Sequence, residues 1–179
     1  GLVGFAAGSR LFAISAFAAE QGGAAADVER IRASLSWLLA NNVKLINMSF
    51  AGPPNIVLEA LLVQAERQGA IMIAAAGNDG ADDDGDVASP ASETAVIAVG
   101  GVTSSGTIWS GSSVGDNNGR IWPLPILTPR NDPHKKPEIV APAYRVPVIN
   151  NQGSWSLVDG TSAATVFVTG AIALLLENN

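Results

Sequence analysis

The chain has 179 residues, 47% of them hydrophobic and 15% charged, and its formal net charge is −6. This acidic balance argues against a nucleic-acid partner, whose binding surface needs clustered lysine and arginine. Cysteine is absent from the sequence, which excludes disulfides and thiolate metal sites. The most apolar segment, residues 163–176, is shorter than the roughly 20 residues that a membrane span needs. We therefore expect a buried helix there and no membrane partner.

The first third of the chain predicts a strand, a helix and a second strand. Residues 9–17 form an apolar run of strand length, and residues 43–50 form another that is partly β-branched. Between them, residues 27–42 repeat apolar side chains at helical spacing, with Asp27 as the expected N-cap. The face of this helix that we expect to be buried consists of Val28, Ile31, Leu35, Leu38 and Leu39.

A second helix is predicted over residues 53–69, and two strands follow it. Asn55 is the expected N-cap of this helix, and Gly69 stands where a helix-ending glycine belongs. The strands are expected at residues 70–76 and 95–102, both short apolar runs. The apolar stripe of the helix consists of Val57, Leu58, Leu61, Leu62 and Ala65.

The remaining chain predicts an irregular region, a strand and a last helix. Glycine, serine, asparagine and proline dominate up to residue 136, with a short hairpin expected around residues 108–109 and 121–122. Residues 136–142 return to a strand, and the last helix follows Gly160. Alternating strands and helices predict a three-layer α/β fold, a mainly parallel sheet with helices on both faces. No linker divides residues 1–179, so we expect one domain.

Ser162 stands at the start of the last predicted helix, in the segment GTSAATVFVTG. At a helix N-terminus, free backbone N–H groups and the helix dipole stabilise a developing oxyanion, so Ser162 is a candidate nucleophile. Serine is also a common N-cap residue, and on local sequence alone the cap is the default interpretation. A nucleophilic serine needs a base, and the chain has one histidine, His134.

Asn78 follows a predicted strand, in the segment AAAGNDG. Ligands bind at the strand ends of open parallel sheets, where the Asn78 amide can donate a hydrogen bond. Standing alone, the same segment is an ordinary Gly-Asn turn.

Five segments, in this order, resemble segments of the subtilisin-like serine proteases: VKLINMSFAGP, IMIAAAGNDG, SPASETAVIAVGGV, KPEIVAP and DGTSAATVFVTG. The family pattern around the nucleophile, G-T-S-x-A-x-P-x-V-x-G, is matched except at Val166, which replaces the proline. The resemblance runs along nearly the whole chain and is weakest between residues 107 and 134. It implies that Ser162 is the nucleophile and that Asn78, with the Ser162 backbone N–H, is the oxyanion donor.

The resemblance also implies a peptide or protein substrate. The strand that would pair with an extended substrate by β-augmentation consists of Ser49, Phe50, Ala51 and Gly52. The other side of the primary specificity pocket would consist of Ala75, Ala76 and Gly77. Because these residues are small, we expect a roomy apolar slot.

In this family the catalytic residues follow the chain order Asp, His, Ser. Neither the aspartate that follows the first strand nor the H-G-T-H-type motif occurs in residues 1–179. Residues 1–17 resemble the segment just after the histidine helix. The resemblance therefore implies a single incomplete domain that lacks the N-terminal strands and is inactive alone. His134 matches no base position of the family, and we expect it on a surface loop.

Two sheet edges would be unpaired in such a domain. In the family, the aspartate strand lies between the strands that resemble residues 10–17 and 43–50. Unpaired edge strands are templates for pairing with another chain. We expect the sheet either to rearrange or to associate with another chain through these edges.

Two further motifs have simpler interpretations. GSSVG, residues 111–115, fits the G-x-S-x-G elbow of α/β-hydrolases, with Asp132 and His134 in that fold's order, but DNNGRIWP follows where the elbow needs a helix. The acidic run could hold calcium through Asp79, Asp82, Asp84 and Asp86, although a solvated loop is the default. No other cofactor is expected, because neither G-x-G-x-x-G nor a Walker lysine occurs.

A second class of function stays open, a non-catalytic protease-like module that binds peptides or partners. Val166 in place of the family proline favours it, as does Ala143 where a glycine is expected. The localisation is open as well: residues 1–10 lack the basic region of a secretory signal, whereas members of the family that the chain resembles are often secreted.

Overall fold

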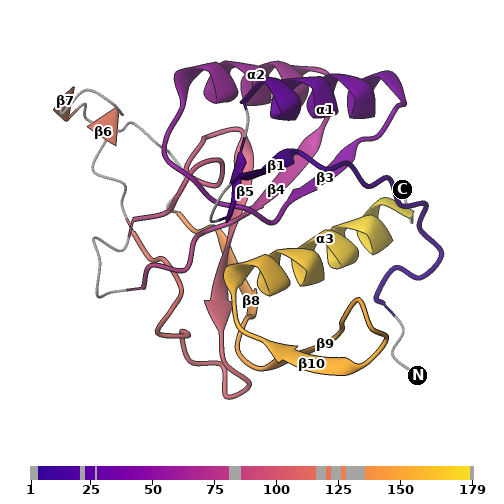
Figure 1. Ribbon diagram of the computed structural model, residues 1–179, viewed down its shortest axis with the longest axis vertical. Coiled ribbons are helices and arrows are strands. Elements are labelled where there is room, and N and C mark those ends of the chain that lie inside the picture. The colour runs from indigo at the N-terminus through magenta and orange to yellow at the C-terminus, as the bar shows by residue number, and fades with distance from the viewer. Residues whose placement is uncertain are drawn as a thin grey trace.

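Strands and helices alternate along the chain and build three layers. The computed structural model describes residues 4–20, 23–26, 28–80, 86–115, 120–121, 126–127 and 136–177. Figure 1 shows two helices, α1 and α2, over one face of a central sheet and α3 over the other. This arrangement confirms the predicted α/β architecture. The helices are α1 Val28–Ala40, α2 Ile56–Arg67 and α3 Thr161–Glu177.

The central sheet has four strands in the order β3-β4-β5-β8, and all three pairings are parallel. Each strand lies inside a range that the sequence predicted. The parallel prediction is confirmed. Between β3 and β4 the chain returns to the same end of the sheet through α2, whereas no helix lies in the described residues between β4, β5 and β8. The strands are β3 Leu45–Met48, β4 Ile71–Ala75, β5 Val96–Val102 and β8 Ile139–Pro142.

Strand β4 is buried on both faces and separates two hydrophobic cores. Met72 and Ala74 belong to the core under α1 and α2, together with Leu62. Ile73 points to the other side and belongs to the core under α3, together with Val168. This double burial explains why the strand is a continuous apolar run and not an alternating one.

Helix α2 begins and ends at the residues that the sequence predicted. The Asn55 side chain accepts hydrogen bonds from the backbone N–H groups of Val57 (2.9 Å) and Leu58 (3.1 Å). Gly69 lies just past the helix with a φ of +82°, a conformation that favours glycine. The predicted stripe is wrong at Val57, which is 50% exposed, whereas its neighbour Leu58 is buried in the core. Asp27, the expected N-cap of α1, lies outside the described residues.

The strand predicted at residues 9–17 is wrong. Residues 10–16 lie outside helices and strands, and Leu11 is 88% exposed. Strand β1, Phe17–Glu20, pairs antiparallel with β2, Gly23–Ala26. A strand needs a neighbour for its hydrogen bonds, and within the described residues the central sheet ends at β3.

Other local predictions also changed in the structure. Ile108 bridges to Val102 across a turn at Gly106, while β6, Arg120–Ile121, pairs with β7, Ile126–Leu127. The predicted pairing of residues 108–109 with 121–122 is therefore wrong, because nearer segments supply the partners. Trp122 lies outside the described residues.

Strands β9 (Val146–Ile149) and β10 (Trp155–Val158) form a hairpin that the sequence analysis missed. The turn of this hairpin is made by Asn150, whose side chain accepts hydrogen bonds from the backbone N–H groups of Gln152 and Ser154. In the sequence, the turn-favouring segment NNQG, residues 150–153, was the signal that could have indicated this hairpin.

Helix α3 is buried on one side only, which corrects the expectation of a buried helix. Ala164 and Val168 pack on the sheet, whereas Val166 is 58% and Leu175 66% exposed. Among the described helices, none is long and apolar enough to cross a membrane.

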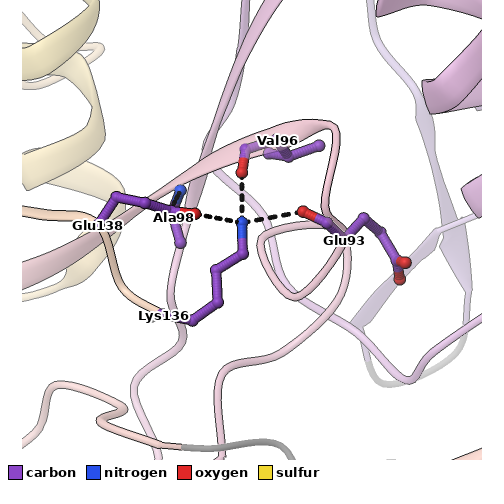
Figure 2. A network of polar contacts seen from close by, with 5 residues as sticks. All are labelled: Glu93, Val96, Ala98, Lys136 and Glu138. Carbon is purple, nitrogen blue, oxygen red and sulfur yellow. Dashed lines mark hydrogen bonds and ion pairs between the residues drawn. The ribbon is translucent and has the colours of Figure 1, made fainter. Parts of the chain in front are cut away.

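A partly buried ion pair fastens the chain just before β8 to β5 (Figure 2). The Lys136 side chain is buried, and its Nζ lies 2.7 Å from Glu138 Oε1. The same ammonium donates to the backbone carbonyls of Glu93 (2.9 Å) and Val96. The second carboxylate oxygen of Glu138 accepts the backbone N–H of Ala98 at 2.7 Å. All donors of the ammonium are therefore used, as a buried charge requires.

Candidate active site

Ser162 is the second residue of α3, and only Asp159 and Gly160 separate this helix from β10. Its hydroxyl is half-buried and donates to the backbone carbonyl of Ser49 at 2.9 Å. An N-cap side chain would instead precede the helix and accept one of its N–H groups. The capping interpretation of Ser162 is therefore wrong.

Ser49 and its neighbours connect the end of β3 to the first turns of α3. The Ser49 hydroxyl donates to the Ser162 carbonyl at 3.1 Å, so the two serines exchange hydrogen bonds. Asn47 donates through Nδ2 to the Ser49 hydroxyl (2.9 Å) and accepts through Oδ1 from the Thr169 hydroxyl (3.0 Å). The chain of contacts fixes the predicted substrate strand beside the candidate nucleophile.

Asn78 lies on the loop after β4, and its side chain is turned toward the start of α3. Its Oδ1 accepts the backbone N–H of Thr161 at 2.9 Å and lies 3.0 Å from the Thr161 hydroxyl. The Nδ2 group makes no hydrogen bond within the described part of the chain. It lies 3.5 Å from the position that a Cβ on Gly160 would take. The Asn78 Nδ2 group is thus available as a hydrogen-bond donor beside the turn that carries Ser162.

Thr161 is a site residue to which the sequence analysis assigned no role. It is fully buried, and its hydroxyl accepts the backbone N–H of Gly77 at 3.2 Å. The same hydroxyl lies 3.1 Å from the Gly77 carbonyl. The conspicuous G-T-S motif was the only sequence signal, because the partner segment is 84 residues away.

The two predicted substrate-binding segments flank this site. Ala75, Ala76 and Gly77 are buried at the end of β4, while Ala51 is exposed after β3. Gly52 has both backbone groups engaged, since it exchanges hydrogen bonds of 2.8 and 3.0 Å with Ser89. Of the predicted substrate strand, Gly52 is therefore already paired within the chain.

A groove lies elsewhere on the molecule, away from Ser162. It has a volume of about 300 Å³ and is formed between α1 and α2, on the layer opposite α3. Its wall includes Leu35, Leu39, Leu61 and Gln68.

No base contacts the Ser162 hydroxyl among the described residues. His134, the one histidine, lies outside them, so its expected surface position stays a prediction. The nearest carboxylate along the chain, Asp159, accepts the backbone N–H of Arg145 at 2.6 Å. This aspartate therefore stabilises the turn before α3.

The calcium prediction stays a prediction. Asp82 and Asp84 lie outside the described residues, whereas Asp79 and Asp86 lie within them. In the part of the chain that the structure describes, no three carboxylate or histidine side chains are grouped closely enough to hold a metal ion.

Comparison with known proteins gives consistent matches. A family model described as the subtilase family matches residues 1–179. Subtilisin NAT from Bacillus subtilis subsp. natto is 30% identical over 181 aligned residues, which cover this whole chain and 42% of that protein. Subtilisin from Bacillus pumilus is 29% identical over 181 residues, covering this whole chain and 58% of that protein. The chain thus spans about half the length of the curated relatives it matches.

A solved structure agrees with the sequence matches. The structure of the prenylagaramide maturation protease PagA has a TM-score of 0.70 to this chain at 26% identity. The match covers 90% of this chain and 53% of that one.

Proposed function

The chain belongs to the subtilase family, and on that basis we propose that it is the nucleophile-bearing part of a serine endopeptidase. The observation that supports this most directly is the approach of Asn78 to the turn that carries Ser162. Thr161 holds Asn78 Oδ1 through its backbone N–H, which leaves Nδ2 free to donate. A free donor beside a serine at a helix N-terminus is suited to acyl transfer.

The proposed reaction forms an acyl-enzyme on Ser162. A base takes the hydroxyl proton while Oγ bonds to the carbonyl carbon of the scissile peptide. The carbonyl oxygen becomes an oxyanion, which accepts hydrogen bonds from Asn78 Nδ2 and the Ser162 backbone N–H. When the intermediate collapses, the amine leaves with the proton from the base. Water then attacks the ester in the same way and releases the acid.

Residues 1–179 alone should be inactive, because we propose that the base and its aspartate come from outside them. Serine proteases that lose one triad member retain only about 10³–10⁴-fold acceleration over water, from the oxyanion hole and binding. We accordingly propose that these residues form a single incomplete domain.

We propose an extended peptide as the substrate. Ser49, Phe50 and Ala51 would supply backbone partners on one side. Small residues at the end of β4, Ala75 to Gly77, would leave space for an apolar side chain on the other. The Ser49 carbonyl now accepts the Ser162 hydroxyl, so a substrate N–H that uses this carbonyl would release the nucleophile.

A non-catalytic binding module is the second candidate. One observation favours it: the Ser162 hydroxyl is already engaged by Ser49, and no base contacts it among the described residues. In this case the same segments would hold a peptide without cleaving it.

We further propose that the chain associates with itself or with another chain through β3. This strand is the outer one of the central sheet, and one of its edges has no strand partner in the described part of the molecule. The exposed Val166 on α3 lies one turn before Thr169, which contacts β3 through Asn47. An apolar side chain thus lies near an unpaired edge.

A fluorophosphonate probe tests the enzyme proposal, because it reacts covalently with activated serines. The full-length protein that contains this chain should be labelled, and Ser162→Ala should abolish the label. Ser154→Ala, at an exposed serine of the β9–β10 turn, is the matched control and should leave it unchanged. Absence of label on Ser162 in the full-length protein would exclude the enzyme and favour the binding module.

A further inference from the structure

The GSSVG segment, residues 111–115, packs against the loop that carries Asn78. Ser113 is fully buried and Ser112 is 2% exposed. The helix that a nucleophilic elbow needs does not follow within the described residues up to 115, so neither serine has the position of such a nucleophile. Two adjacent buried hydroxyls nevertheless need hydrogen-bond partners, and their partners are informative.

Ser113 holds the backbone on both sides of Asn78. Its N–H donates to the carbonyl of Gly77 at 3.0 Å, and its hydroxyl accepts the N–H of Asp79 at 3.3 Å. The approach is close: a Cβ on Gly77 would lie 2.7 Å from Ser113 Oγ, and Gly77 has a φ of +117°. Only a glycine before Asn78 therefore permits this contact.

Ser112 anchors the same segment to the central sheet. Its hydroxyl accepts the N–H of Gly101, in β5, at 2.8 Å. Its own N–H donates to the carbonyl of Trp109, whose N–H donates to the carbonyl of Gly101; both distances are 2.9 Å. The connection from β5 through Ser112 and Ser113 to the Asn78 loop is therefore continuous.

We propose that Ser113 is a positioning residue for Asn78, an inference that rests on the proposed role of Asn78 as oxyanion donor. Ser113 fixes the backbone of the loop, while Thr161 fixes the Asn78 amide from the opposite side. An oxyanion donor must lie about 2.7–3.1 Å from the oxygen in the transition state. Small shifts of the loop should therefore lower kcat more than they raise KM.

The first measurement is spectroscopic and uses residues 1–179. Ser113→Ala should shift the NMR signals of the Asn78 side-chain amide and speed exchange of the Asp79 amide roughly tenfold, since that N–H loses its acceptor. Ser92→Ala is the matched control, because it also removes the hydroxyl of a buried serine, one that contacts Glu93 and not the Asn78 loop. It should leave the Asn78 side-chain NMR signals in place and the exchange rate of the Asp79 amide within about twofold of the wild type.

The second measurement uses the active full-length protein. Ser113→Ala should lower kcat roughly 10- to 100-fold with KM changed less than about twofold, whereas Ser92→Ala should keep kcat within about threefold. If Ser113→Ala does not fold, Ser113→Cys carries the test, since its thiol is a weaker acceptor of similar shape and should give intermediate shifts.

Two results would overturn the proposal: unchanged Asn78 signals in Ser113→Ala, or equal losses in both variants. If the wild-type full-length protein hydrolyses no peptide, the proposed function fails separately. The signals in residues 1–179 then still decide whether Ser113 positions Asn78.

Discussion

Ser49 and Ser162, 113 residues apart in the sequence, each donate a hydroxyl hydrogen bond to the other's backbone carbonyl. The pair joins the end of a strand to the first turn of a helix on the other side of the candidate site. This relationship gives the first prediction.

Ser49→Ala should destabilise the protein by about 1–2 kcal/mol, because it removes one of the two hydrogen bonds of the pair and the acceptor of Asn47 Nδ2, while the Ser49 carbonyl stays in place. The free energy of unfolding in urea measures the effect. Ser154→Ala, at an exposed serine, is the control and should change stability by less than about 0.5 kcal/mol. Equal stabilities of the two variants would mean that the hydroxyl contributes nothing to the connection.

Thr161→Val should destabilise the protein by about 1–3 kcal/mol, because the isosteric side chain leaves the buried N–H of Gly77 without its acceptor. The Asn78 side-chain NMR signals should move at the same time. Thr161→Ser keeps the hydroxyl and loses only a methyl group, so those signals should stay in place. Movement in both variants would show that the methyl group, and not the hydroxyl, orients Asn78.

Gly77→Ala should cost more stability than Gly106→Ala, although both glycines have positive φ. The backbone strain is also larger at Gly77, whose φ of +117° lies farther from the left-handed region that other residues reach than the φ of +79° at Gly106. A Cβ on Gly106 meets open space, whereas one on Gly77 would lie 2.7 Å from Ser113 Oγ. We expect an extra cost of about 1–3 kcal/mol from the clash and the strain together, measured by chemical denaturation. Equal losses of stability in the two variants would mean that the segment around Ser113 can move away from the added methyl group at little cost.

Lys136→Met should lower stability by about 1–3 kcal/mol, since it leaves the partly exposed Glu138 carboxylate without its counter-charge and two backbone carbonyls without their donor. Lys136→Met combined with Glu138→Leu should recover part of the loss, because no unpaired charge remains. Thermal and urea unfolding measure both. If the double variant were less stable than the single one, Glu138 would contribute more by accepting the N–H of Ala98 than by its ion pair with Lys136.

Val166→Lys should reduce association of the chain, because it places a charge beside the unpaired edge of β3. Light scattering over a range of protein concentrations gives the molecular mass. Ile108→Lys, at another exposed apolar residue, is the control and should leave the mass unchanged. A monomer at all concentrations in the wild type would rule out self-association and leave only pairing with a different chain.

Local signals in the sequence predicted local structure well. Asn55 and Gly69 marked the ends of α2, since capping depends on a few adjacent residues. The parallel sheet followed from short apolar runs between helices. The strand prediction for residues 9–17 was wrong because a strand needs a neighbouring strand for its hydrogen bonds, and the sequence of the segment itself does not encode that neighbour.

The candidate site was predicted in its residues but not in its contacts. Ser162 and Asn78 stood in segments with a family pattern, so they could be found. Ser113 could not, because its partners Gly77 and Asp79 lie more than 30 residues away and the motif around it suggested a different fold. The hydrogen bond between Ser162 and Ser49 also depends on tertiary structure alone.

Strand β4 has a consequence for how the molecule loses its structure. Met72 and Ala74 contribute to one core and Ile73 to the other, so neither core can melt while the other stays packed. Amide protons of β4 should therefore exchange only through global unfolding. Asn78 is three residues past the last residue of this strand. The candidate oxyanion donor is thereby attached to the segment that we expect to open last.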